Sequence, residues 1–213
     1  MAINLYLGKP LKDYTYDDLK KLKRKQLLEL FYQLDPPGMS DLHGEYRAAM
    51  LNSGPVTNTF SAWLFLNCTW GTWQHKAFEP LGKQDGHGYN TFITTRSKVP
   101  ENYFAANAMN IVYLLTSLFR AKKTPRLARI MLNKTSIVSS VFDGRPSFQL
   151  SYKEYNSFFT NTMTDELRTV NDKLYLGVGR LTVNGGKNNP TVFALSGPPA
   201  PWVGPDIPYP ELG

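Results

Sequence analysis

The sequence is nearly free of cysteine. Cys68 is the only one among 213 residues, which excludes a disulfide framework and any zinc site built from several cysteines. The first residues also lack the cationic stretch and apolar core of a secretory signal. We therefore expect a reducing compartment, with the cytoplasm as the default location.

Metal and catalytic signatures are missing too. The three histidines, His43, His75 and His87, do not form HxH or HxxxH pairs, so we predict no metal site. Ser139 and Ser140 lack a Gly-x-Ser-x-Gly context, so a hydrolase nucleophile elbow is not indicated. We expect no cofactor.

The chain contains no long apolar run. Residues 102–119 are uncharged, but asparagines interrupt them, and only 111–119 is strongly apolar. A helix that spans a membrane needs about 20 apolar residues. We therefore expect a helix here that either covers one end of the domain or lies at a membrane surface.

Positive charge is unevenly distributed. The chain has 24 Lys and Arg against 17 Asp and Glu, and the excess is concentrated around Lys20–Lys25 and Arg120–Lys134. These segments favour contact with an anionic membrane surface, which would make the protein peripheral to a membrane; the alternative is that they are solvated lysines beside helices. Zinc-finger, RNP and helix-turn-helix patterns are absent, so we do not expect a nucleic-acid partner.

What the sequence does contain is one amphipathic helix followed by many short strands. Thr15 and Asp18 have the spacing of a capping box, and an apolar stripe runs along 15–34. Short Gly, Asn and Asp turns separate the later segments, which predicts an antiparallel meander that curls into a barrel. The predicted strands are 42–51, 70–78, 89–95, 126–132, 136–142, 147–152, 165–170, 174–183 and 191–195, with 60–66 as a strand or short helix.

Several of these segments resemble a known family. Leu42–Arg47 (LHGEYR), Trp73–Phe78 (WQHKAF) and Asp143–Pro146 (DGRP) are similar to segments of the GxWxG-type uncharacterised proteins, and Asp165–Gly177 resembles their closing strands. More generally the pattern resembles calycin or lipocalin-like barrels. Three positions depart from the family's motifs: Tyr46 stands in place of Trp, Ala48 in place of the second Gly, and His75 in place of Gly.

The resemblance implies a mainly β protein with flanking helices, an antiparallel calycin/lipocalin-like β-barrel. We expect residues 1–38 to form an N-terminal amphipathic helix and linker packed on the barrel. Residues 39–196 form the barrel domain, with a helical insert near 102–119. Residues 197–213 form a Pro-rich C-terminal tail that lies over the domain or is mobile.

A lipocalin-like barrel implies a small apolar or amphipathic ligand in an internal cavity. The polar end of the ligand would be held by Arg47, Lys76, Tyr152 or Arg168. Arg168 shares a strand face with Glu166, and this face points either into the barrel or to the surface. The aromatic residues predicted to line the cavity are Tyr46, Trp73, Phe78, Tyr89, Phe92, Phe148, Tyr152 and Tyr175.

Three functions remain open at this level. The first is an intracellular barrel that binds a small molecule. The second is a cofactor-independent isomerase, cyclase or lyase in the same barrel, with Lys76, Tyr152 and Glu166 as candidate acids and bases. The third is a peripheral membrane or interaction module that uses the two basic segments.

Overall fold

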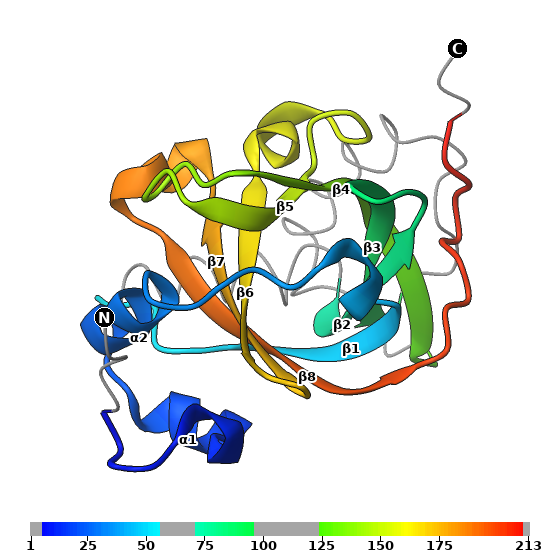
Figure 1. Ribbon diagram of the computed structural model, residues 1–213. Coiled ribbons are helices and arrows are strands. Elements are labelled where there is room, and N and C mark those ends of the chain that lie inside the picture. The colour runs from blue at the N-terminus through cyan, green and yellow to red at the C-terminus, as the bar shows by residue number, and fades with distance from the viewer. Residues whose placement is uncertain (1–5, 56–70, 96–123, 211–213) are drawn as a thin grey trace.

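Eight antiparallel strands close into a barrel (Figure 1). The computed structural model describes residues 6–55, 71–95 and 124–210. Each strand pairs with the next one along the chain, and the last pairs with the first. The prediction of a mainly β protein with an antiparallel barrel is confirmed. The strands are β1 (Gly44–Met50), β2 (Thr72–Pro80), β3 (Asp85–Thr94), β4 (Arg126–Ser139), β5 (Pro146–Ser151), β6 (Thr164–Asn171), β7 (Leu174–Arg180) and β8 (Thr191–Ala200).

The amphipathic N-terminal segment forms two short helices instead of the single helix predicted over 15–34. They are α1 (Tyr16–Lys21) and α2 (Arg24–Phe31). Leu22 is extended between them, and the Gln26 side chain accepts a hydrogen bond from the Lys23 amide and so caps the second helix. The predicted capping box of Thr15 and Asp18 is present at the start of α1. Short 3₁₀ helices lie at Leu11–Asp13, Met39–Asp41, Phe158–Thr162, Thr182–Asn184 and Gly186–Asn188.

Two predicted strand boundaries are wrong for the same reason. The segments predicted as 126–132 and 136–142 merge into one long strand, β4, which ends at Ser139, because Asn133 and Lys134 pair with β3 although asparagine favours turns. The strand predicted over 89–95 begins earlier, since the Leu81 and Gly82 amides bond to the Asp85 carbonyl and β3 starts at Asp85. Pairing with neighbouring strands outweighs local propensity here.

The buried apolar residues form two clusters. One fills the barrel and includes Tyr46, Phe78, Phe148 and Leu167. The other lies between the helices and the outer face of β6, β7 and β8, and the stripe predicted along 15–34 supplies it with Leu27, Leu30, Phe31 and Leu34. Figure 1 shows both helices outside the barrel, and they contact β7 and β8.

Irregularities in the strand pairing decide which side chains point inward. In β2 the register with β3 shifts between Trp73 and His75. A second shift puts an extra residue into β4, where the interval from Ile130 to Asn133 faces the shorter interval from Gly88 to Asn90. Simple alternation would place Trp73 and Lys76 on opposite faces. The bulge adds one residue to β2 between them, which restores Trp73 to the face of Lys76, so both side chains point into the barrel.

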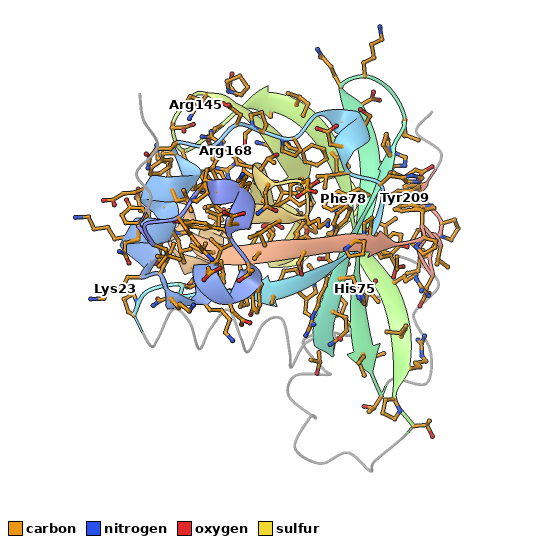
Figure 2. All side chains as sticks on the ribbon, turned by 60° about the horizontal axis from the view of Figure 1, so that its bottom comes forward. Lys23, His75, Phe78, Arg145, Arg168 and Tyr209 are labelled. Carbon is orange, nitrogen blue, oxygen red and sulfur yellow. The ribbon has the colours of Figure 1, made fainter. Side chains whose placement is uncertain are left out.

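The segment after β8 lies along the outside of β3 and β4. The Trp202 ring lies 4.6 Å from the Tyr89 ring, and Tyr209 stacks on His87 with 4.1 Å between ring centroids. The Asp206 amide donates to the Arg129 carbonyl at 2.8 Å. In Figure 2, Tyr209 and Lys23 mark opposite sides of the molecule.

The lysines and arginines of the two basic segments mostly face acidic neighbours. In α1 and α2, Lys20, Lys21 and Lys25 lie 3.4, 3.1 and 3.9 Å from acidic groups of the same helices. Arg126, Arg129 and Lys134 also pair with carboxylates. These contacts reduce the positive potential that an anionic membrane would meet, although most of the pairs are exposed and weak.

No helix within the described residues is long and apolar enough to cross a membrane. The segments predicted at 60–66 and 102–119 lie outside the described residues, as do residues 120–123 of the second basic segment.

Candidate functional site

Lys76 is the centre of a polar cluster inside the barrel. It points inward from β2, and only 2% of its surface is exposed. Its ammonium group donates to Asp165 Oδ2 at 2.7 Å, to Tyr152 Oη at 2.5 Å and to Asn90 Oδ1 at 3.1 Å. We call these four residues, Lys76, Asn90, Tyr152 and Asp165, the interior polar cluster.

The other members also bond to one another. Tyr152 donates its hydroxyl hydrogen to Asp165 Oδ2 at 3.0 Å, and Asn90 Nδ2 lies 3.1 Å from the same hydroxyl. The Asn90 amide group also donates to the Met131 carbonyl and accepts from Trp73 Nε1. Four strands thus contribute to one connected network, which fixes the position of each group.

Aromatic rings surround the ammonium group. The rings of Trp73, Tyr152 and Phe193 have their centroids 5.4, 5.2 and 5.3 Å from Lys76 Nζ. Such contacts stabilise a cation by about 0.5–2 kcal/mol each, more when water is excluded. The site therefore combines one ion pair with an apolar, π-rich wall.

Burial changes the acid–base properties of the cluster. Removal from water lowers the pKa of Lys76, and the negative charge of Asp165 opposes that change. Burial also raises the pKa of Tyr152 well above its ordinary value, and Asp165 adds to this effect. Tyr152 is therefore a hydroxyl donor at neutral pH.

Two glycines of β7 make room for the site. A Cβ at Gly177 would lie 2.2 Å from the Phe193 ring, and one at Gly179 would lie 2.6 Å from Asp165 Oδ1. The ring and the carboxylate both occupy space that any larger residue would fill. The two glycines of Leu176-Gly177-Val178-Gly179 therefore leave the space that the Phe193 ring and the Asp165 carboxylate occupy.

Most of the predicted aromatic lining is inside the barrel. Tyr46 packs edge-on against Phe78 and Tyr175, with centroids 5.8 and 5.6 Å away, and Phe78 packs on Phe148 at 5.6 Å. Phe92 also belongs to this cluster. These rings belong to the apolar cluster that fills the barrel.

Three predicted ligand-binding residues, Arg47, Tyr89 and Arg168, have their side chains outside the barrel interior. Arg47 is exposed on the outer face of β1. Tyr89 points outward from β3, where it donates to Glu45 at 2.7 Å beneath Trp202. Tyr89 alternates with the inward-pointing Asn90 along β3 and pairs with Ala77 between Lys76 and Phe78, so the inward orientation expected for it is wrong.

Arg168 is buried but not in the interior. It extends from the outer face of β6 toward α2, and its guanidinium forms a bidentate ion pair with Asp143 at 2.8 and 2.9 Å. It also donates to the carbonyls of Phe31 and Leu34. The expectation of an inward ligand anchor is therefore corrected: Arg168 joins the helix to the barrel.

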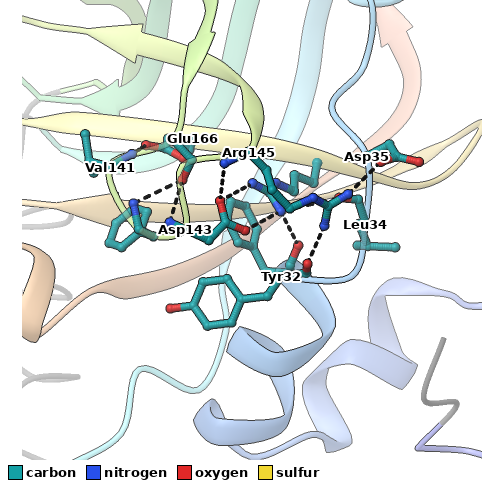
Figure 3. A network of polar contacts seen from close by, with 11 residues as sticks. Tyr32, Leu34, Asp35, Val141, Asp143, Arg145 and Glu166 are labelled. Carbon is teal, nitrogen blue, oxygen red and sulfur yellow. Dashed lines mark hydrogen bonds and ion pairs between the residues drawn. The ribbon is translucent and has the colours of Figure 1, made fainter. Parts of the chain in front are cut away.

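Glu166 lies on the same outer face and is separate from Lys76 and Tyr152. One of its oxygens accepts from the Val141 amide at 2.8 Å (Figure 3). Nearby, Arg145 bonds to Asp35 at 2.8 Å and to the Tyr32 carbonyl. Of the three predicted acids and bases, the structure brings together Lys76 and Tyr152 only.

Sequence reasoning missed Asp165, Asn90 and Phe193. Asp165 shares a strand face with Leu167, which lies in the interior cluster, and this alternation along β6 was the signal that could have found it. Asn90 becomes visible only through strand register, because it pairs directly with Lys76. Within the described part of the chain, no group of three or more His, Cys, Asp or Glu residues could hold a metal ion.

Comparisons with known proteins add only a general likeness. No protein-family model matches the chain, and no curated protein matches it. The GxWxG resemblance therefore gains no support from a sequence family. A crystal structure of a protein from Thermomonospora curvata is similar, with 16% identity and a TM-score of 0.48 over 82% of this chain and 87% of that chain.

Proposed function

We propose that the barrel binds a small, mostly apolar molecule whose polar group meets the interior polar cluster. The observation that carries this proposal is the Lys76–Asp165 ion pair, buried among aromatic rings in the barrel. An ion pair in such a place contributes little net stability, because desolvation offsets the attraction between the charges. Its presence therefore favours a role in recognition.

The surroundings support a ligand that is largely apolar. Tyr46, Phe78, Phe148 and Tyr175 present carbon surface to the same interior, and burial of apolar area contributes about 25 cal/mol per Å² to binding. A few polar groups set in such a lining are the usual composition of a small-molecule site.

Native mass spectrometry of gently purified protein, followed by titration with a fluorescent lipid probe, tests this function. We expect a saturable complex in the wild type and at least tenfold weaker binding in Lys76→Met/Asp165→Asn, which removes both charges together. Arg47→Met is the matched control, because Arg47 is exposed outside the barrel. Equal affinity in all three proteins, or no saturable binding, contradicts the proposal.

A proton-transfer enzyme is the second candidate, and one observation favours it. Tyr152 Oη lies 2.5 Å from an amine and 3.0 Å from a carboxylate, so an acid and a base meet at one point. Asp165 would take a proton from the carbon beside a ketone as that C–H bond breaks. The resulting enolate oxygen would accept hydrogen bonds from Tyr152 and Lys76, and return of the proton would restore Asp165.

Deuterium uptake into octan-2-one in D₂O, followed by NMR, tests this second function. The wild type should exchange the protons beside the carbonyl faster than buffer alone. Asp165→Asn should lose the exchange, while Arg47→Met should keep it. Exchange at the buffer rate in the wild type counts against the enzyme and leaves the binding function unaffected.

A further inference from the structure

Asn133 has a buried amide group that bonds to nothing in the described part of the chain. It lies in β4 and is fully buried, with 0% of its surface exposed. Neither its oxygen nor its nitrogen has a hydrogen-bond partner.

The strand pattern places this amide inside the barrel. Asn133 shares a face of β4 with Thr135, whose hydroxyl contacts Met39 in the interior cluster, and with Ile137, which packs on that cluster. A Cβ at Gly88, its partner on β3, would lie 2.6 Å from the Asn133 oxygen. The interior is therefore shaped around the amide on the β3 side.

Asn133 is also next to the interior polar cluster. Lys134 pairs with Ser151, and continuing this register by one residue places Asn133 opposite Tyr152. Tyr152 in turn bonds to Lys76 and Asp165. The unpaired amide and the proposed binding site thus share the same region of the barrel.

An unpaired buried amide has a free energy cost, since its groups lose their bonds to water without replacement. Buried polar groups in native proteins have partners in the great majority of cases. The amide of Asn133 presents one acceptor and donors side by side. Its natural complement is a group that both donates and accepts.

Charge restricts the complement further. Lys76 and Asp165 already compensate each other at 2.7 Å. A carboxylate or an amine entering this interior would add a charge that no described interior residue balances, and burying such a charge is costly. A neutral polar group would add none.

We propose that Asn133 selects the ligand, and that the ligand carries a neutral group with both a donor and an acceptor, such as a primary amide, on an apolar body. This inference rests on the proposed binding function. It assigns Asn133 as the residue that distinguishes neutral from charged ligands, beside the cluster that holds the ligand.

Calorimetric titration with octanamide and octanoate tests the inference. We expect the wild type to bind octanamide at least tenfold more tightly than octanoate. Asn133→Leu and Asn133→Ala should both lose this preference, mainly by weakening octanamide. Two variants are used because leucine fills the space of the amide and alanine leaves it open. The Lys76→Met/Asp165→Asn variant should weaken both probes.

The outcomes separate the inference from the function beneath it. If both probes bind and depend on Lys76 and Asp165, but the Asn133 variants keep the wild-type preference, the inference is wrong and the binding function stands. If neither probe binds the wild type, both fail. Stability gives an independent readout: Asn133→Leu should unfold at a urea concentration no lower than the wild type, because it removes an unpaired group. A clear drop with an unchanged preference would show that Asn133 is satisfied by buried water alone.

Discussion

At the scale of single residues, the interior depends on charges that compensate each other. Lys76 and Asp165 are almost fully removed from water, with 3% and 8% of their side chains exposed. Each charge compensates the other, because a single unpaired charge in this buried environment would strongly destabilise the folded protein. Their contribution to the free energy of unfolding therefore has to be measured for the two residues together.

A double-mutant cycle should reveal this coupling. Lys76→Met and Asp165→Asn should each lower the free energy of unfolding by about 3–5 kcal/mol, since each leaves one buried charge alone. The double variant should lose much less than the sum of the two. Urea unfolding at pH 7 measures all four proteins; additive losses would show that the two groups do not stabilise each other.

Two buried tyrosines should make the protein sensitive to alkali. Burial raises the pKa of Tyr89 and of Tyr175 from 10.0 to about 12. Between these values the unfolded chain loses the phenol protons and the folded chain keeps them. The stability is therefore fully present below pH 10 and is lost as the pH rises toward 12. Lys76 has the opposite sign, because its lowered pKa makes stability rise with pH up to its ordinary value of 10.5.

Urea unfolding at pH 9, 10 and 11, with absorbance at 295 nm to follow phenol ionisation, checks this. Tyr89→Phe should lose less stability between pH 9 and 11 than the wild type does, because the phenylalanine variant has no proton there to lose. An identical alkaline decline in both proteins would contradict the assignment of Tyr89.

At the scale of elements, small side chains on one strand face large side chains on the neighbouring strand. Gly177 on β7 pairs with Phe193 on β8, and the ring covers the glycine. The bulge in β2 contributes as well, since it brings Trp73 to the face on which Lys76 pairs with Asn90. Outside, Arg168 forms a bidentate bond with Asp143 and donates to the carbonyls of Phe31, the last residue of α2, and Leu34, which follows it, and these bonds fix the end of α2 on β6.

Gly177→Ala should destabilise the barrel by about 1–3 kcal/mol, the usual cost of overpacking a close-packed interior. The Phe193 ring would have to move away from the new methyl group. Adding Gly177→Ala to Phe193→Ala should cost less than adding it to the wild type, because the ring is then absent. Thermal unfolding of the four proteins measures the effect, and equal costs in both backgrounds would exclude the ring as the cause.

At the scale of the whole molecule, the barrel is covered on two sides by segments from the two ends of the described chain. The helices cover β6 to β8, and residues 201–210 cover β3 and β4 (Figure 1). The second cover encloses a polar group of its own: Glu45 bonds to Arg129 at 2.6 Å and to Tyr89 at 2.7 Å. The Val203 and Gly204 amides donate to the same tyrosine.

Truncation after Ala200 should lower Tm by several degrees. It removes Ile207, which is buried and whose side chain alone contributes about 1.5–3 kcal/mol, and it exposes Tyr89 to water. For a chain of this size, 1 kcal/mol corresponds to about 2–4 °C. Val203→Ala is the control, since that side chain is 62% exposed. Calorimetry that shows no difference between the truncated and full chains would mean that the docked segment adds no stability.

The sequence by itself determined the class of fold and much of the inner wall. Alternating apolar residues and short polar turns are local properties of the chain, and they were enough to predict an antiparallel barrel with Tyr46, Phe78, Phe148 and Tyr175 inside. The apolar stripe over 15–34 likewise predicted a buried helical face, although not the break at Leu22.

Only the tertiary structure decided the composition of the site. Lys76 meets Tyr152 and Asp165 across separations of 76 and 89 residues, and no local pattern encodes such contacts. A single bulge in β2 reverses the side chains beyond it, which is why Trp73 joins Lys76 inside, whereas Tyr89 lies outside because it alternates with the inward-pointing Asn90. Arg168 is outside because β6 presents that face to α2. Strand register, a property of paired chains, thus set the chemistry of the interior.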